Sequence, residues 1–425
     1  MAEEQFFQMF LSGLRESVGR LSPPGFNSSP FKASYLSKWC PYDEACEPDG
    51  AVAACDGSIS ESSFSGGLVV WVARSVAHIY SRGREPVSLL EAGVEAGYRL
   101  QGRELFLRAL ELRTLRRALE KAFQSHGRVL GIFDGSLYLT FLHNRDRLKA
   151  VSRVFESYVK ELTLLLKLVD GERMVIGLSK DSDISYLRAK IMIDILHSLD
   201  PGLASVARGR SIRRIREVLS EKVKGLSSDS MLETCFNELE QDFSDEGVYS
   251  DIAPGPGFTK PLLLAPQTIF LTGETRSTSW WDSGFRSRLK RDEALKGVLE
   301  ALDSYFSNPP VALTFWRPSL SSRVYRVDIP SNILGYSDAG GSLSADFFID
   351  DSGVEKAKKI FGVLNRLQHE PHIVHPLAEV DSIARLSRSI YRYAYEPVVV
   401  EELRRRGFKA SPRRRSIRDA VLRGC

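Results

Sequence analysis

The sequence predicts an α/β fold built on a mixed central sheet, and three observations favour this class. The 425 residues are 43% hydrophobic and 26% charged, which is typical of globular proteins. Apolar runs of strand length alternate with longer segments of helical periodicity. Two of the apolar runs end in the same triplet, Asp-Gly-Ser. In a sheet of this kind, ligands are expected where the strands end.

The first half of the chain alternates between the two kinds of segment. Leucine spacing predicts helices, and β-type apolar runs predict strands. We expect, in order, a helix at Glu4–Arg20, a proline-rich loop at Ser22–Gly50, a short strand at Ala51–Cys55, one long or two short strands at Gly67–Tyr80, a long helix at Ser88–Ser125, a strand at Arg128–Phe133, its hairpin mate at Leu137–Leu142 and a helix at Asp146–Leu168.

The second half continues the pattern with a helical interruption. We expect a strand at Met174–Leu178, a helix starting near Asp183 and capped by its neighbours, a mostly helical insertion at Gly202–Asp251 with a linker to Gly257, strands at Thr268–Thr272, Val311–Arg317 and Arg323–Ile329, and helices at Ser352–Arg366 and Leu377–Tyr393. The order predicts one elaborated domain at 48–395, with an insertion at about 202–257. An N-terminal helix and loop at 1–47 and a tail at 396–425 flank it.

The net charge of +4 is too small to indicate a nucleic-acid binder by itself. Its distribution is uneven, because the last 25 residues hold nine basic and three acidic side chains. This basic tail is expected either to add phosphate contacts or to form a solvated helix or a docking strip for a partner. The longest apolar run, Gly66–Tyr80, is interrupted by Arg74 and His78 and is too short to span a membrane. The acidic start, MAEEQFF, is unlike a signal peptide, so we expect a cytoplasmic protein.

Both Asp-Gly-Ser triplets follow a buried-type strand, so Asp56 and Asp134 are candidate ligands at two strand ends. The glycine after each aspartate would let backbone or ligand approach closely. Asp-Gly is also a common turn, so an ordinary exit from a strand remains the alternative.

Two further carboxylates lie on predicted helices. Glu111 has Leu107 and Leu115 one turn away on either side, so it faces the packed side and must be metal-bound or paired with an arginine. Glu104 lies on the same face and is a weaker candidate. Asp381 lies near the start of the last long helix, where the helix dipole alone would stabilise an acid.

The order of these acids is similar to that of ribonuclease H-like nucleases: Asp on an early strand, Glu on a helix, Asp after a middle strand and Asp on a late helix. Two divalent cations about 3.5–4 Å apart in such a site activate water and stabilise the leaving oxygen of a phosphodiester. Carboxylate oxygens suit Mg²⁺ or Mn²⁺. The sequence therefore predicts a metal site made of Asp56, Glu111, Asp134 and Asp381.

The chain resembles the NurA family of nucleases over roughly residues 48–395. The segments that carry the resemblance are AVAACDGS (51–58), LRALELRTLRRAL (107–119), GRVLGIFDGSL (127–137), VIGLSKDS (175–182) and VYRVDIP (324–330). The resemblance implies a ribonuclease H-like core with Asp56, Glu111 and Asp134 as metal ligands. It also implies that Lys180 lies near the active site or DNA, and that Arg323 and Arg326 face phosphate, for which structural ion pairing is the alternative.

The resemblance has further implications for activity and partners. It implies a Mn²⁺- or Mg²⁺-dependent enzyme with 5′-to-3′ exonuclease and single-strand endonuclease activity, which acts in DNA-end resection and double-strand break repair. It implies a homodimer that works with a HerA-type hexameric ATPase, in a prokaryotic and specifically archaeal cytoplasm. A DNA-binding subunit without activity and an enzyme directed at RNA are the alternatives.

The last family motif is where the sequence departs from the pattern. Family members have Tyr-Pro-x-Pro-Leu leading into Ala-His, and here Ile373 stands at the tyrosine position and Asp381 at the histidine position. An aspartate as fourth ligand is normal in the wider ribonuclease H-like class. His375 is a substitute candidate, with a structural role as its alternative. Trp280, Trp281 and Trp316 are candidates for stacking on bases, with core packing as the alternative.

Overall fold

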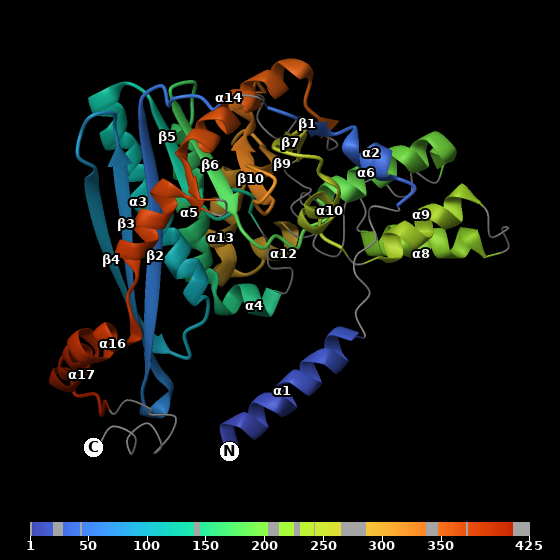
Figure 1. The fold of residues 1–425 in the computed structure, drawn as a ribbon. Coiled ribbons are helices and arrows are strands. Elements are labelled where there is room, and N and C mark those ends of the chain that lie inside the picture. The colour runs from blue at the N-terminus through green and yellow to red at the C-terminus, as the bar shows by residue number, and fades with distance from the viewer. Residues whose placement is uncertain are drawn as a thin grey trace.

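The computed structural model describes residues 2–19, 29–42, 45–139, 145–202, 212–224, 230–241, 243–264, 286–336, 347–370 and 373–410. Within these residues the fold is a mixed sheet flanked by helices, which confirms the predicted class (Figure 1). The 11-stranded sheet has the main order β1-β7-β9-β10-β6-β5-β2-β3-β4, and β8 and β11 extend it beside β9.

Only the centre of the sheet is parallel. The strands β2 (Ala51–Ser63), β5 (Val129–Asp134) and β6 (Arg173–Ser179) run parallel to one another. All other pairings in this sheet are antiparallel. The other strands are β1 (Trp39–Cys40), β3 (Leu68–Tyr80), β4 (Val87–Tyr98), β7 (Gly257–Thr259), β8 (Leu262–Leu263), β9 (Val311–Arg317), β10 (Tyr325–Pro330) and β11 (Phe347–Phe348), with β12 (Gln368–Glu370) and β13 (Ile373–Val374) in a separate ladder.

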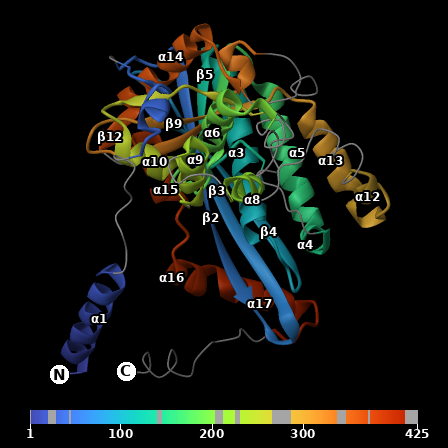
Figure 2. The ribbon, with the colours of Figure 1, turned by 90° about the vertical axis from the view of Figure 1, so that its right-hand side faces the viewer.

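Both faces of the central strands are buried, which explains why their sequences are continuously apolar. On β2, Ala51, Ala53 and Cys55 belong to one hydrophobic core, and Val52 and Ala54 belong to the other. Helices α3 (Arg103–His126), α5 (Ser152–Leu168) and α13 (Lys296–Phe306) pack side by side over the first core (Figure 2). Helices α14 (Asp351–Leu367) and α15 (His375–Ala384) cover the second.

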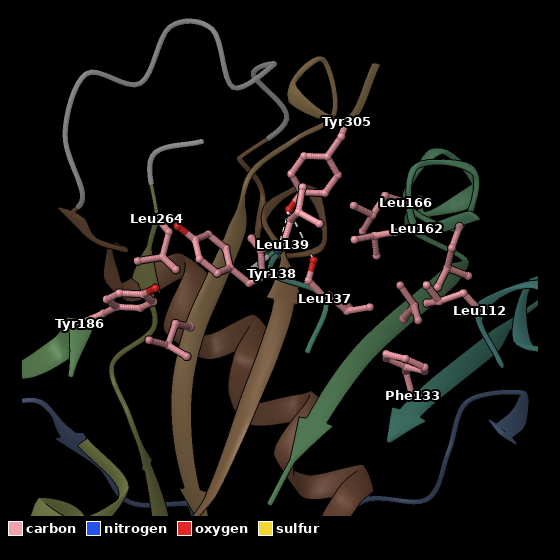
Figure 3. Packing of buried hydrophobic residues seen from close by; sticks show 14 of the residues in the cluster. Leu112, Phe133, Leu137, Tyr138, Leu139, Leu162, Leu166, Tyr186, Leu264 and Tyr305 are labelled. Carbon is pink, nitrogen blue, oxygen red and sulfur yellow. Dashed lines mark hydrogen bonds between the residues drawn. The ribbon is translucent and has the colours of Figure 1, made fainter. Parts of the chain in front are cut away.

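The first core extends beyond the ends of β5 and β6. Leu137, Tyr138 and Leu139 follow β5 and are buried against Tyr305 of α13 (Figure 3). The amide of Leu139 donates to the Tyr305 hydroxyl over 3.2 Å. This short buried segment fixes the chain directly after the second Asp-Gly-Ser triplet.

The remaining helices lie near the two ends of the chain, in the insertion and in connections between strands. Where it is described, the 202–257 region is mostly helical, as predicted. These elements are α1 (Ala2–Gly19), α2 (Lys32–Leu36), α4 (Arg145–Ala150), α6 (Tyr186–Leu199), α8 (Ile212–Val223), α9 (Met231–Glu240), α10 (Asp245–Ile252), α12 (Arg286–Lys290), α16 (Arg388–Ile390), the π-helical turn η8 (Tyr391–Tyr395) and α17 (Glu396–Arg405), with short 3₁₀ turns at Ser65–Gly67, Glu293–Leu295 and Ser331–Leu334. No helix of the described chain has the length and apolar character that a membrane crossing needs.

The predicted helix at Ser88–Ser125 is wrong in its first part. Val87–Tyr98 is strand β4, which pairs with β3 along its length, and the helix begins only at Arg103. The segment alternates between two faces with period two, and Gly93 lies directly under the Phe106 ring of α3. A Cβ at Gly93 would lie 3.0 Å from Phe106 Cζ, so close packing of helix on strand decides the conformation.

Three other boundaries differ from the predictions. The strand predicted at Ala51–Cys55 continues to Ser63, because β3 pairs with it over its whole length. Leu137–Leu139 form no strand, because the amides of Leu137 and Tyr138 donate to the buried carboxylate of Asp328. Residues 140–142 of that predicted hairpin, and the strand predicted at Thr268–Thr272, lie outside the described residues.

Two predicted helices have different ends. The helix expected near Asp183 begins at Tyr186, where the Asp245 carboxylate accepts the amide protons of Leu187 and Arg188 over 2.9 and 2.8 Å. A distant side chain therefore provides the cap that nearby residues were expected to give. The helix predicted at Leu377–Tyr393 ends at Ala384, where side chains of β2 and β3 bind its last carbonyls.

Candidate active site

The two aspartates of the repeated triplet lie side by side where the parallel pairing of β2 with β5 ends, although β2 itself continues to Ser63 beside β3. In the register of β2 and β5, Cys55 pairs with Phe133, and Asp56 and Asp134 are the next residue on each strand. Neighbouring strands are about 4.8 Å apart, so the two carboxylates share one edge of the parallel region. The structure therefore brings together the two residues that the triplets singled out.

Glu111 reaches the same place from helix α3. The helix packs on β2 and β3 through Leu107, Leu112 and Leu115, and Glu111 is only 2% exposed. A Cβ at Gly57 would lie 2.9 Å from the Glu111 Oε1 atom. Because Gly57 has no side chain, the Glu111 carboxylate has room to lie against β2, next to the point where its parallel pairing with β5 ends.

The alternative considered for Glu111, an ion pair with an arginine, is also present. Arg108 Nη1 donates to Glu111 Oε2 over 3.1 Å and to the main-chain carbonyl of Asp134. Glu104 instead bonds the neighbouring Arg103 at the exposed start of the helix. Of the two glutamates, only Glu111 faces the carboxylate cluster.

Asp381 is carried to the site by α15. The Ser58 hydroxyl, which closes the first triplet, donates to the carbonyl of Ala384 and accepts the amide of Leu386 over 2.8 Å. Arg74 of β3 donates to the same Ala384 carbonyl over 3.1 Å. This end of the helix is thereby fixed over β2, and Asp381 lies close enough to Asp56 to raise its pKa.

Lys180 lies beside the cluster, as the resemblance implied. It follows β6, the third parallel strand, and its Nζ is 3.2 Å from Asp134 Oδ2. Three of the four carboxylates thus have a basic partner, since Arg108 bonds Glu111, Lys180 bonds Asp134, and Arg385 bonds Asp381 over 3.3 Å.

Burial and mutual repulsion perturb the acids. Loss of solvent raises the pKa of Asp56 to about 6, and the charges of Asp134 and Asp381 add to this increase. Burial likewise raises the pKa of Glu111 to about 8, with Arg108 opposing the shift and Asp56 and Asp134 adding to it. Burial, together with the neighbouring carboxylates, thus makes proton binding by Asp56 and Glu111 more favourable than in an exposed acid.

The donor set fits a hard divalent cation, since every candidate ligand is a carboxylate. As the side chains lie, the described residues contain no group of three His, Cys, Asp or Glu closed around an ion position. Arg108 and Lys180 bond two of the four acids in this arrangement. If a metal is held here, Asp56, Glu111, Asp134 and Asp381 are the residues that would hold it.

The two arginines of the late strand region have structural partners. Arg323 bonds Asp181 and Glu246 of the insertion, with 3.1 Å to Glu246. Arg326 is buried and bonds Asp328 over 2.8 Å. Both side chains form ion pairs, which is the alternative to phosphate binding. The guanidinium of Arg326 is also too buried to contact a phosphate.

The structure describes some of the other candidate residues. Trp316 is fully buried and donates to the Tyr42 hydroxyl over 3.0 Å, so it is a core residue. Trp280 and Trp281 lie outside the described residues. His375 is half exposed at the start of α15, 4.0 Å from Glu379 on the same helix.

Sequence reasoning missed three residues that build the site. Ser58 and Ser136 end the two triplets, and each anchors a distant element: Ser58 holds α15, and Ser136 donates to Asp328 of β10 over 2.6 Å. The third is Arg108. The repetition of serine in both triplets was the available signal, whereas nothing marked Arg108 among the basic residues of its helix.

The order β4-β3-β2-β5-β6, with only β2, β5 and β6 parallel and with carboxylates gathered where the pairing of β2 with β5 ends, agrees with the ribonuclease H-like fold class that the sequence predicts. Within that class, the model of the NurA domain matches residues 50–386. The chain therefore belongs to the NurA family, a family of nucleases. A search of curated proteins found no match.

Solved structures of the family are similar to this chain at low sequence identity. The crystal structure of the NurA nuclease from Sulfolobus solfataricus is 14% identical with a TM-score of 0.49, over 95% of this chain and 99% of that one. A crystal structure of NurA with manganese is 13% identical (TM-score 0.39, 97% and 99% covered). A crystal structure of NurA bound to dAMP and manganese is 12% identical (TM-score 0.38, 93% and 96% covered).

Proposed function

We propose that the protein is a DNA nuclease that hydrolyses phosphodiester bonds with two divalent cations, Mn²⁺ or Mg²⁺, held by Asp56, Glu111, Asp134 and Asp381. The observation that carries the proposal is the convergence of Asp56, Asp134 and the buried Glu111 where the parallel pairing of β2 with β5 ends. When bound, such cations activate water and stabilise the leaving oxygen. The manganese in two solved NurA structures supports the choice of metal.

The chain's own residues have distinct tasks in this proposal. Ser58 and Arg74 hold the end of α15, which keeps Asp381 over Asp56. Lys180 lies at the edge of the cluster, partly exposed, where it is suited to bind a phosphate once it leaves Asp134. Arg323, partly exposed, is a second candidate for DNA contact, and it would have to leave Asp181 and Glu246 to serve.

Family membership also supports the finer features of the proposal. We propose 5′-to-3′ exonuclease and single-strand endonuclease activity in DNA-end resection and double-strand break repair, together with a HerA-type hexameric ATPase. The bound dAMP of one solved NurA structure is consistent with a DNA substrate. An inactive DNA-binding subunit is the second candidate, because Ile373 and Asp381 depart from the family motif.

A homodimer belongs to the same proposal, and β4 supplies the surface that supports it. This strand is the edge of the described sheet, and its outward row is exposed and apolar: Leu90, Ala92, Val94, Ala96 and Tyr98. An apolar row on an edge strand is normally covered. A second copy would bury it against the same row.

The test is cleavage of end-labelled DNA with Mn²⁺ by the full-length chain and by Asp56→Asn, with RNA and RNA–DNA hybrid as competing substrates. Asp194→Asn is the control, because Asp194 is an exposed helix residue paired with Lys190. We expect cleavage of DNA by the wild type and the control, and a loss of at least about 100-fold in Asp56→Asn. Equal absence of cleavage in all three proteins would favour the inactive subunit, and preferred cleavage of RNA would favour a ribonuclease.

A further inference from the structure

Arg108 connects the helix that carries Glu111 to the strand that carries Asp134. Its Nη1 donates to Glu111 Oε2 over 3.1 Å and to the main-chain oxygen of Asp134. Its guanidinium carbon also lies 5.5 Å from the centre of the Phe133 ring. Both hydrogen bonds come from one nitrogen, which therefore connects the helix to the strand, although the side chain is 41% exposed.

The glycine of the second triplet leaves the space that Arg108 occupies. A Cβ at Gly135 would lie 3.0 Å from Arg108 Nη1 and 3.3 Å from Cζ. Gly135 also has a φ of 155°, a conformation that residues with a side chain rarely adopt. The first triplet's glycine faces the Glu111 carboxylate in the corresponding way. The two glycines thus accommodate the two members of one ion pair.

Among the described residues, Arg108 alone donates a hydrogen bond to the Glu111 carboxylate. A glutamate has several rotamers, and without Arg108 the carboxylate would be free to turn away from the ends of β2 and β5. The position of Glu111 beside Gly57 therefore depends on the guanidinium that connects it to Asp134.

We propose that Arg108 is a positioning residue that holds the Glu111 carboxylate at the strand ends, ready for a divalent cation. This inference rests on the proposed function, since it assumes that the cluster binds metal. Partners that orient metal ligands in this way commonly contribute 10-fold to 100-fold to metal affinity. A cation that merely repelled the metal would have the opposite effect, because its removal would tighten binding.

Helix α3 offers a matched control. Arg113 lies on the same helix, is equally exposed at 41%, and bonds a buried glutamate, Glu161, over 2.9 Å. Its partner is not part of the carboxylate cluster. Arg113→Ala therefore removes a comparable ion pair without touching the candidate site.

The experiment measures Mn²⁺ binding by calorimetry to the full-length wild type, Arg108→Ala, Arg108→Lys and Arg113→Ala. We expect Arg108→Ala to bind Mn²⁺ about 10-fold or more weakly. Arg108→Lys, which keeps the charge on a shorter side chain without the planar guanidinium, should be intermediate, and Arg113→Ala should match the wild type. In cleavage assays, the Mn²⁺ concentration for half-maximal rate should rise in Arg108→Ala, with a smaller change in kcat at saturating Mn²⁺.

The outcomes separate this inference from the function on which it rests. Unchanged or tighter Mn²⁺ binding by a folded Arg108→Ala protein would overturn the role of Arg108 alone. A wild type that neither binds Mn²⁺ nor cleaves DNA would overturn the proposed function as well. If Arg108→Ala does not fold, Arg108→Lys decides, and a Mn²⁺ affinity equal to that of the wild type would count against the proposal.

Discussion

At the scale of single residues, each position of the Asp-Gly-Ser triplet has its own task. The aspartates lie on adjacent strands where the parallel pairing of β2 with β5 ends. The glycines leave space for Glu111 and Arg108, and the serines anchor α15 and β10. Asp56, Glu111 and Asp134 were predictable because apolar neighbours around an acid are unusual. The serine contacts were not, because the partner of Ser58 lies 326 residues away along the chain.

The buried Glu111 makes a prediction about pH. Its pKa is raised from 4.5 to about 8 in the metal-free folded protein, so the folded state binds this proton more tightly than the unfolded state does. The resulting stability is fully present below about pH 4.5 and is lost as pH rises through 8. We expect Glu111→Gln, which stays neutral, to be more stable than the metal-free wild type at pH 8, by on the order of 1–3 kcal/mol.

Urea unfolding of both proteins at a series of pH values, with chelator present, measures this difference. The wild type should lose stability between about pH 5 and pH 8, and Glu111→Gln should lose less. The pKa of Asp56 is also raised, to about 6, and this adds a smaller loss of stability with rising pH in both proteins. If the free energies of unfolding of the two proteins changed in parallel with pH, Glu111 would be ionised over the whole pH range. Its burial would then not raise its pKa.

At the scale of elements, tertiary contacts overrode local sequence signals. Val87–Tyr98 has a period-two pattern that favours a strand, but it lies directly before the leucine-rich segment from Leu100 to Leu119, whose helical spacing dominates the prediction. Pairing with β3 and the packing of Phe106 on Gly93 stabilise Val87–Tyr98 as a strand. The end of α15 was equally hidden, because the side chains that bind its carbonyls come from β2 and β3. The strands β5, β6 and β9 were predictable because both of their faces are buried.

The anchoring of α15 makes a prediction about coupling. Ser58→Ala removes the hydroxyl that holds Ala384 and Leu386, so Asp381 should lose its fixed position over Asp56. We expect cleavage to fall by roughly 10-fold in Ser58→Ala, and the double variant with Asp381→Ala to be no worse than Asp381→Ala alone. Ser63→Ala, whose hydroxyl bonds only the exposed Glu61 in the described chain, is the control on the same strand. Fully additive losses in a double-mutant cycle would refute the coupling.

At the scale of the whole molecule, the clustered charged residues and the exposed apolar residues lie in different regions of the fold. The small net charge of +4 conceals a carboxylate cluster in the centre and a basic C-terminal segment. The first part of that segment is not a free tail, because Leu403 of α17 and Ala410 are buried against Phe64, Leu68 and Val70. The exposed row on β4 lies at the edge of the same sheet. Neither feature was predictable, since each depends on which faces the fold leaves uncovered.

The proposed dimer surface makes a prediction about mass in solution. Val94 is 63% exposed at the centre of the β4 row, and an aspartate there would place a charge in the interface of both copies. We expect light scattering after size-exclusion chromatography to show a dimer for the wild type and a monomer for Val94→Asp. Leu320→Asp is the control, because Leu320 is 66% exposed in a loop away from β4. A Val94→Asp protein that remains dimeric would exclude this surface as the dimer contact.

The most direct test of the carboxylate site is a crystal structure of the full-length chain with Mn²⁺, with anomalous scattering recorded at the manganese edge. The account predicts anomalous peaks among Asp56, Glu111 and Asp134, with Asp381 as a further ligand and with Lys180 moved from Asp134. Manganese bound only at other positions, or a cluster that keeps its Arg108 and Lys180 ion pairs without any peak at saturating Mn²⁺, would contradict it.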